Sequence, residues 1–146
     1  MLKGISPILS PDLLAGLCAM GHGDEVVLAD GHFPGEMFAS RRFVRADGVD
    51  VPRMLDAILP LFELDAYVDA PMTTMEAVPG DTLDPAVERA YRAVADRHGQ
   101  AWAKIARLER FAFYERAKRA FLIIQTGDTA KYANLILKKG VTPVKR

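Results

Sequence analysis

Hydrophobic residues recur at helical spacing in four segments of the chain. In the first segment, leucine or methionine stands at positions 13, 14, 17 and 20, so one face of a helix would be apolar. Three of the segments begin with a capping residue and a proline: Ser10-Pro11, Asp50-Val51-Pro52 and Asp84-Pro85. The pattern predicts helices over about 11–20, 51–59, 85–98 and 110–120.

Short apolar runs lie between these segments and are too short to form helices. Residues 26–29, 122–124 and 134–137 are rich in valine, isoleucine and leucine and are bounded by glycine or turn residues. They predict three strands, and residues 43–45 predict a further one. Because strands that are separated by helices need crossover connections, we expect an α/β fold. Its mostly parallel sheet would be covered by helices on both faces.

Length and composition fit one domain with a sizeable core. The chain has 146 residues, half of them hydrophobic, so we expect a single domain over residues 1–146. Nineteen basic and nineteen acidic residues leave no net charge, which argues against nucleic acid and favours a neutral partner. The N-terminal residues lack the apolar run of a signal peptide, and no apolar run approaches the roughly 20 residues that span a bilayer. We therefore expect a cytoplasmic protein without a membrane partner.

Residues 20–34 bracket a predicted strand with titratable side chains. His22, held between two glycines, leads into the strand, and Asp30 follows it. An imidazole has an unperturbed pKa near ~6.5, so it can both donate and accept protons at neutral pH. This arrangement indicates acid–base chemistry at His22. The single cysteine, Cys18, lies in the apolar stretch of the first helix, so we expect a reduced thiol in the core without a chemical role.

Side chains suited to an uncharged, polyhydroxylated ligand occur later in the chain. Tyr132 and Asn134 are two residues apart in a segment expected to be extended, so their hydroxyl and carboxamide should point the same way. Arg110 lies at the start of a predicted helix, where a positive charge opposes the helix dipole unless another group uses it. Its planar guanidinium could grip vicinal hydroxyls or hold a carboxylate such as Asp30.

Four motifs of the chain resemble those of a known family. The similarity is carried by residues 20–34, by Pro-Leu-Phe-Glu-Leu-Asp-Ala-Tyr at 60–67, by Arg-Phe-Ala-Phe-Tyr-Glu-Arg-Ala at 110–117 and by residues 131–143. In these motifs the chain resembles the sugar mutarotases and pyranases, which include L-fucose mutarotase and D-ribose pyranase. Arg110 makes it most similar to the fucose branch, because the ribose branch has a histidine there. The resemblance runs the full length of the chain.

The resemblance implies an activity and a set of site residues. The activity would be interconversion of the α and β anomers of an aldose, with L-fucose as the first candidate, by ring opening and closure without a cofactor. His22 would be the catalytic proton donor. The sugar-binding residues would be Asp30, Arg110, Tyr132, Ala133 and Asn134. A small residue would be needed at 133, because its backbone would lie against the sugar.

The expected strand also limits the geometry of the site. If residues 24–30 are extended at ~3.3 Å each, His22 and Asp30 lie on the order of 20 Å apart, which exceeds the span of one monosaccharide. We therefore expect that neighbouring subunits of a homo-oligomer build each site together. The ring-shaped decamers of the family that the chain resembles agree with this expectation.

Two other functions remain open at this stage. A metal-dependent aldose isomerase or lyase could draw its ligands from the polar residues around the first strand. These residues are His22, Asp24, Glu25, Asp30 and His32. Their spacing argues against a metal site, because the two histidines lie at opposite ends of the strand. A non-catalytic monosaccharide-binding module associated with sugar uptake would use the same ligand groups as a mutarotase, and only the effect of replacing His22 on turnover would separate the two.

Overall fold

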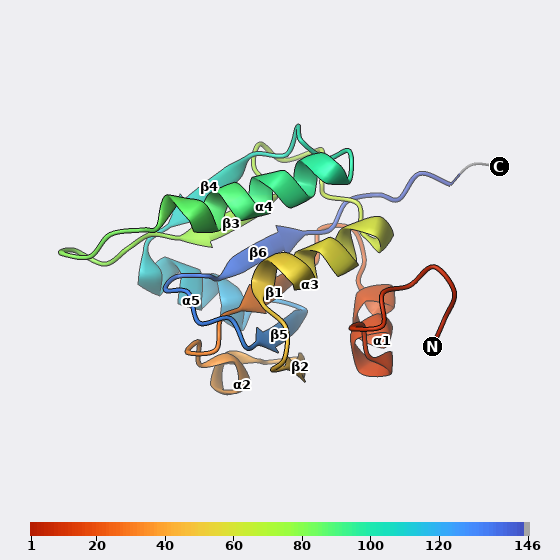
Figure 1. The fold of residues 1–146 in the computed structure, drawn as a ribbon, viewed down its shortest axis with the longest axis horizontal. Coiled ribbons are helices and arrows are strands. Elements are labelled where there is room, and N and C mark those ends of the chain that lie inside the picture. Colours follow the sequence, from red (N-terminus) through yellow and green to blue (C-terminus); the bar gives the residue numbers. More distant parts are fainter. Residues whose placement is uncertain (145–146) are drawn as a thin grey trace.

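The computed structural model describes residues 1–144, which form a six-stranded mixed sheet at the centre of the molecule (Figure 1). The strands are β1 (Glu25–Ala29), β2 (Arg42–Ala46), β3 (Met72–Met75), β4 (Ile105–Leu108), β5 (Leu122–Thr126) and β6 (Leu135–Lys138), in the order β2-β5-β1-β6-β3-β4. β5 pairs in parallel with β1 and β2, and β3 pairs in parallel with β4. β6 runs antiparallel between β1 and β3. The predicted α/β fold with a mostly parallel sheet is confirmed.

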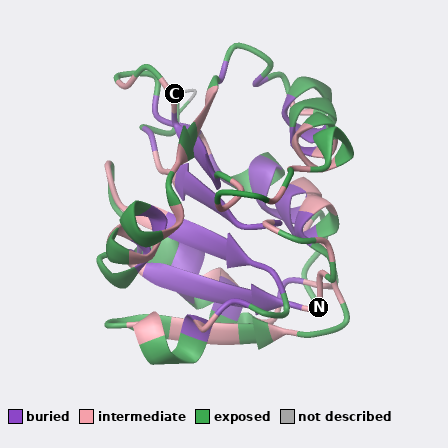
Figure 2. Ribbon diagram, turned by 90° about the vertical axis from the view of Figure 1, so that its left-hand side faces the viewer, coloured by how far each residue is buried: buried purple, intermediate pink, exposed green. Residues whose placement is uncertain are grey.

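Helices cover both faces of this sheet. The α-helices of the described residues are α1 (Pro11–Ala19), α2 (Gly35–Phe38), α3 (Val51–Ile58), α4 (Pro85–Arg97) and α5 (Arg110–Lys118), and a 3-10 turn, η1 (Leu59–Leu61), follows α3. α1, α3 and α4 pack on one face and share a core with alternate strand residues such as Val26 and Leu28. α2 and α5 pack on the other face against Val27 and Ala29. Figure 2 shows the buried central strands between helices whose outer surfaces are exposed.

The helices α1, α3 and α4 begin at the positions that their capping residues predicted. The side chain of Ser10 accepts a hydrogen bond from the N–H of residue 13 at 3.2 Å, and Asp50 accepts one from residue 53 at 2.8 Å. Asp84 accepts one from residue 86 at 2.9 Å. Each bond satisfies an N–H group of the first turn that has no partner within the helix. Pro60 lies in the 3-10 turn at which α3 ends, because its ring cannot continue the helix.

Three elements of secondary structure and the exposure of one side chain differ from the prediction. The strands β3 and β4 and the single-turn helix α2 were not predicted. The prediction that the thiol of Cys18 lies in the core is wrong, because Cys18 is exposed. In α1 the residues Leu13, Gly16 and Leu17 face the core, and the turn of about 100° per residue carries Cys18 away from it.

The pairing of β1 with β6 determines which parts of the chain meet at each end of the sheet. Glu25 lies opposite Lys138 and Leu28 opposite Leu135, so the two strands run in opposite directions along each other. The residues after β1 therefore meet those before β6, whereas the residues before β1 meet those after β6. The predicted site residues occupy both of these ends.

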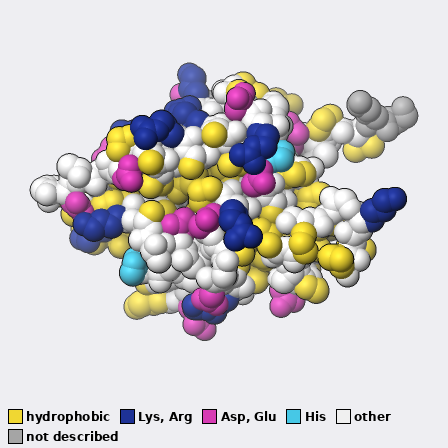
Figure 3. All heavy atoms as spheres, in the orientation of Figure 1, with side chains coloured by type: hydrophobic (Ala, Val, Ile, Leu, Met, Phe, Trp, Pro, Cys, Tyr) yellow, Lys and Arg dark blue, Asp and Glu magenta, His cyan; other side chains and the backbone are white. Residues whose placement is uncertain are grey.

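The surface carries charges of both signs. Figure 3 shows basic and acidic side chains interspersed over one face, with hydrophobic side chains between them. This agrees with the equal numbers of acidic and basic residues in the sequence. None of the helices in residues 1–144 combines the length and the apolar character needed to cross a membrane.

Candidate functional site

A cavity of about 370 Å³ opens where β1 ends and β6 begins. Its volume falls within the range of about 300–1,000 Å³ that is usual for small-molecule sites. Its wall combines polar, aromatic and aliphatic side chains from α5, from the end of β3 and from the segments after β1, after β3 and before β6. The lining residues are Asp30, His32, Phe33, Met75, Val78, Asp81, Arg110, Tyr114, Lys131, Tyr132 and Asn134. Four of the five residues predicted to bind a sugar are among them.

Asp30 and Asn134 form the buried floor of this cavity. The carboxamide oxygen of Asn134 accepts the backbone N–H of Asp30 at 2.8 Å, and its Nδ2 donates to the Asp30 carboxylate at 3.0 Å. The other carboxylate oxygen accepts the backbone N–H of His32 at 2.9 Å. The carboxylate is thus held in one orientation by donors on two sides.

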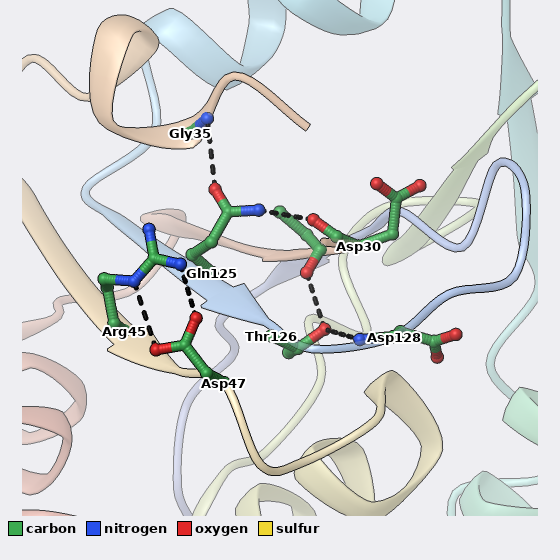
Figure 4. A network of polar contacts seen from close by, with 8 residues as sticks. Asp30, Gly35, Arg45, Asp47, Gln125, Thr126 and Asp128 are labelled. Atoms are coloured by element: carbon green, nitrogen blue, oxygen red, sulfur yellow. Dashed lines mark hydrogen bonds and ion pairs between the residues drawn. The ribbon is translucent and has the colours of Figure 1, made fainter. Parts of the chain in front are cut away.

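The backbone of Asp30 is held from the opposite direction by Gln125. The carboxamide of Gln125 donates to the carbonyl oxygen of Asp30 and accepts from the N–H of Gly35 at 3.2 Å. Figure 4 shows this bridge, with the Asp30 carboxylate pointing away from it. A Cβ at Gly35 would press against the Gln125 oxygen, so a larger residue here would displace this bridge.

Burial raises the pKa of the Asp30 carboxyl above its ordinary value. The hydrogen bonds from His32, Asn134 and Phe33 and the charge of His32 act in the opposite direction but do not outweigh burial. The carboxyl group of Asp30 is therefore easier to protonate than an exposed aspartate.

Tyr132 and Asn134 approach the cavity from a tight turn rather than from an extended segment. Tyr132 has a φ of 59°, in the left-handed region, and the N–H of Asn134 donates to the carbonyl oxygen of Tyr132 at 2.8 Å. The expected extended geometry is therefore wrong, although both side chains line the same cavity. Ala133 is buried between them and does not line the cavity.

The hydroxyl of Tyr132 is held by the loop that follows β3. It donates to Asp81 at 2.8 Å and accepts a longer bond of 3.4 Å from the N–H of Val78. Lys131 also contacts the Asp81 carboxylate, at 3.2 Å. These donors, with Tyr132 the foremost, hold the pKa of Asp81 below its ordinary value.

Arg110 is the first residue of α5 and contributes the cationic wall of the cavity. Its guanidinium lies 4.6 Å from the centre of the Phe111 ring, and its Nε is buried without a hydrogen-bond partner among residues 1–144. Among these residues it forms no ion pair, so the alternative in which it holds Asp30 is not observed. The Glu109 carboxylate caps the helix by accepting two N–H groups at 2.9 and 3.1 Å and offsets the adjacent positive charge.

His22 lies at the other end of β1 and does not line this cavity. Its Nε2 lies 3.2 Å from Oδ1 of Asp65, and its ring lies 5.4 Å from that of Tyr67. The chain therefore presents two separate groups of residues, one around Asp30 and one around His22. The predicted separation of the proton carrier from the sugar-binding residues agrees with this arrangement.

Comparison with known proteins identifies the family. The model of the RbsD / FucU transport protein family matches residues 3–142. The chain belongs to this family.

Individual members of the family agree in sequence and in fold. An L-fucose mutarotase of Actinobacillus pleuropneumoniae (serotype 5b, strain L20) is 55% identical over 145 residues, which cover 99% of this chain and 100% of that protein. The fucose mutarotase of Streptococcus pneumoniae, solved in complex with L-fucose, is 47% identical with a TM-score of 0.91. FucU from Bifidobacterium longum is 49% identical with a TM-score of 0.92. Each of these two structural matches covers 97% of this chain and 100% of the other.

In this RbsD / FucU family member, several residues that belong to the group around Asp30 or to the group around His22 were not predicted as site residues. Asp65 and Tyr67 lie against His22, and Asp81 and Tyr114 line the cavity. The sequence contained one local signal, which is for a turn at Asp65. An aspartate can accept the N–H of the second residue after it, and Asp65 accepts that of Tyr67 at 3.0 Å. No local signal linked either residue to His22, which is 43 positions away from Asp65.

The residues considered as metal ligands are dispersed. His22 and His32 lie at opposite ends of β1, and Glu25 pairs with Arg116 at 2.8 Å. Within residues 1–144, no three histidine, cysteine, aspartate or glutamate side chains are grouped so that they could hold a metal ion. The interpretation as a metal-dependent isomerase therefore has no ligand set among the described residues.

Proposed function

We propose that the protein is an L-fucose mutarotase, which interconverts the α and β anomers of this sugar by opening and closing its ring. The observation that carries the proposal is the cavity in which the polar groups of Asp30, Arg110, Tyr132 and Asn134 converge. Together they offer donors and acceptors to a ligand whose hydroxyl groups both donate and accept. The relatives named L-fucose mutarotase and the relative solved with L-fucose support this choice of sugar.

The apolar wall of the cavity supports a deoxy sugar. Phe33, Met75, Val78 and Tyr114 line the cavity beside the polar groups. L-fucose carries a methyl group where L-galactose carries a hydroxymethyl group. Burying the methyl against this wall contributes about 0.8 kcal/mol, whereas an added hydroxyl without a partner costs about 1–3 kcal/mol. We expect the enzyme to favour L-fucose over L-galactose for this reason.

The chemistry requires proton transfer alone. Removing the proton of the anomeric hydroxyl and protonating the ring oxygen breaks the C1–O5 bond, and the reverse steps close the ring on either face. We assign this transfer to His22, and general acid–base catalysis of this kind contributes ~10²–10⁴ in rate. Asp30, Arg110, Tyr132 and Asn134 bind the sugar, with the backbone at Ala133 against it.

The separation of His22 from the cavity supports a site shared between subunits. We propose that His22 of one protomer completes the cavity of its neighbour in a homo-oligomer, and a decamer is the assembly that we expect. The cytoplasmic location also stays a prediction.

The test is NMR saturation transfer between the α and β signals of L-fucose, with the wild type compared with His22→Ala in metal-free buffer. We expect His22→Ala to lose ~10²-fold or more in turnover with little change in sugar affinity. His98→Ala is the matched control, because His98 pairs with Asp56 at 2.8 Å, away from both groups. Wild-type turnover in His22→Ala would exclude His22 as the proton carrier.

Mixed oligomers test the shared site. His22→Ala and Asp30→Asn should each keep only a small residual activity alone, but each site of a mixture draws one residue from each of two subunits. Random mixing should restore about one quarter of wild-type activity, because both contributing subunits must carry the intact residue. A mixture that stays at this residual activity, although the subunits have exchanged, contradicts the shared site.

The same experiments separate the two other functions. A non-catalytic binding module would broaden the sugar signals without any exchange above buffer. A metal-dependent isomerase would lose its activity on exhaustive chelation, whereas we expect chelation to leave anomer exchange unchanged.

A further inference from the structure

A second cavity, of about 210 Å³, lies between α4 and the strands β3 and β4 (Figure 1). α4 packs on the face of the sheet opposite to α5, so this cavity opens on the other side of β3 from the cavity around Asp30, which we call the first cavity. The two cavities share Met75, Lys131 and Tyr132 as lining residues. They are therefore neighbours, with the turn at Tyr132 in the wall of each.

Thr74 is the buried polar side chain of the second cavity. Successive residues of a strand point to opposite faces, so Thr74 faces the side of α4 and Thr73 the side of α5. The two residues are 5% and 1% exposed. The Thr73 hydroxyl accepts a hydrogen bond from Arg116 at 3.1 Å, whereas the Thr74 hydroxyl has no partner among residues 1–144. It is not one of the fully enclosed side-chain atoms that lack a partner, so it is reached from the cavity.

The charges in the wall of the second cavity balance. Glu88 accepts hydrogen bonds from Nε and Nη2 of Arg107 at 3.1 and 2.8 Å. Burial alone would raise the pKa of Glu88, but the bonds and charges of its arginine partners outweigh burial and lower that pKa. Lys131 contacts Asp81 at 3.2 Å, and Asp84 caps α4 by accepting an N–H of the first turn at 2.9 Å. The wall therefore favours a neutral ligand over an ion of either sign.

The groups that remain free suit a molecule with several hydroxyl groups. The Thr74 hydroxyl can donate and accept, and Nη1 of Arg107 and Oδ2 of Asp84 make no hydrogen bond within residues 1–144. Leu83 and Val87 add apolar surface for the C–H groups of such a molecule. The volume lies below the range of about 300–1,000 Å³ that is usual for drug-sized ligands, which limits an occupant to about the size of one monosaccharide.

We propose that the second cavity is a binding site for a neutral, polyhydroxylated molecule no larger than one monosaccharide. The site goes beyond the proposed function, because neither His22 nor Asp30 lines it. Its occupancy does not require that the protein interconverts anomers. The free Thr74 hydroxyl is the group that such a ligand would pair.

Methyl NMR distinguishes the two cavities in the intact assembly. The probes are L-fucose, D-ribose and glycerol, and inorganic phosphate is the ionic control. Leu83 and Val87 line the second cavity and not the first, whereas Val78 lines the first and not the second. We expect at least one of the three polyols to shift the methyl signals of Leu83 and Val87 saturably, with a Kd that differs from the one reported by Val78. Phosphate should leave these signals unshifted.

Two substitutions of Thr74 place the binding. Thr74→Val removes the hydroxyl at nearly constant volume and should raise the Kd reported by Leu83 by ~2–10-fold, as expected for the loss of one hydrogen bond. Thr74→Met fills the cavity and should abolish the saturable shift of Leu83. Both variants should keep the wild-type titration at Val78. Thr73→Val is the matched control, because it removes a buried hydroxyl on the opposite face of the same strand, and it should leave the Kd at Leu83 at the wild-type value.

The outcomes separate this site from the proposed function. The absence of a saturable shift at Leu83 and Val87 with all three polyols would overturn the site, as would titrations of Leu83 that are the same in Thr74→Met and the wild type. Binding of phosphate in place of the polyols would overturn the neutral class of ligand. A wild-type protein without anomer exchange would instead overturn the proposed function, whatever Leu83 and Val87 report.

Discussion

Asp30 and Asn134 hold each other through two hydrogen bonds, although 104 positions separate them in the sequence. One joins the Asp30 N–H to the carboxamide oxygen, and the other joins the carboxamide nitrogen to the carboxylate. The antiparallel pairing of β1 with β6 brings the two residues together, because one follows β1 and the other precedes β6. Asn134 therefore both lines the cavity and fixes the orientation of its carboxylate.

Replacing Asn134 by alanine should impair sugar binding and stability together. The change leaves the buried N–H of Asp30 without a partner, which costs about 1–3 kcal/mol of the free energy of unfolding. It also frees the carboxylate to turn, so we expect KM for L-fucose to rise ~10-fold or more. The measurements are anomer exchange by NMR and denaturant unfolding.

Gln100→Ala is the matched control for this substitution. Gln100 is also a buried carboxamide, and it bonds to the N–H of Leu64 at 2.9 Å and to the carbonyl oxygen of Phe62 at 3.1 Å, away from the cavity. It should lose a similar amount of stability and keep the wild-type KM. Equal KM values in the two variants would contradict an orienting role for Asn134.

The raised pKa of Asp30 predicts how activity declines in acid. An accepting carboxylate is needed for sugar hydroxyls, so kcat/KM should fall on the acid side with an apparent pKa above 3.8, the ordinary value for aspartate. In the native state the group keeps its proton to a higher pH than in the unfolded chain. Its contribution to stability is therefore fully present below 3.8 and is lost as pH rises through the native pKa.

The pH profile of Asp30→Asn checks this assignment. Its residual kcat/KM should fall less steeply in acid than that of the wild type, because only groups other than Asp30 still titrate. An identical acid limb in the two proteins would assign the titration to another group.

Much of the fold was predictable because its signals are local. Capping residues before prolines determine where α1, α3 and α4 begin, and the apolar runs at β1, β5 and β6 are buried on both faces. β3 was not predictable in this way, because Thr73 and Thr74 interrupt any apolar run. Its strand conformation depends on pairing with β6 and β4, and a buried Thr73 accepts a hydrogen bond from Arg116 at 3.1 Å.

The site residues were predicted partly from family motifs and partly from the chemistry of their side chains. The structure places them in two groups. Asp30, Arg110, Tyr132 and Asn134 line one cavity, as the hydrogen-bonding argument required. The left-handed turn at Tyr132 was not predictable, because the hydroxyl and carboxamide spacing fits an extended strand equally well. The partners of these side chains, such as Asp81, depend on contacts between distant segments that no local pattern records.

Gly140→Ala should reduce turnover without a change at the cavity. A Cβ at this position would lie 2.6 Å from the carbonyl oxygen of Leu64 and 2.9 Å from the Cα of Asp65, so the segment opposite His22 must move. Overpacking of this kind costs about 1–3 kcal/mol of stability. We expect a lower melting temperature and a lower kcat with an unchanged KM. Gly48→Ala is the control, because a Cβ there meets open space. A Gly140→Ala variant with wild-type kcat would show that Asp65 tolerates displacement.

Asp81→Ala should loosen the loop after β3 and weaken sugar binding more than catalysis. Asp81 accepts from both the Tyr132 hydroxyl at 2.8 Å and Lys131 at 3.2 Å, so its removal frees one wall of the cavity. Because the donors lower its pKa, these contacts persist above the unfolded pKa of 3.8 and are lost as pH falls through the native value. We expect faster amide exchange across residues 76–84 and a several-fold higher KM with kcat within about twofold, since His22, the proposed proton carrier, does not line this cavity. Thr82→Ala, an exposed change in the same loop, should leave both quantities at wild type. If KM in Asp81→Ala equals that of Thr82→Ala while amide exchange rises, the loop does not shape the bound sugar's site.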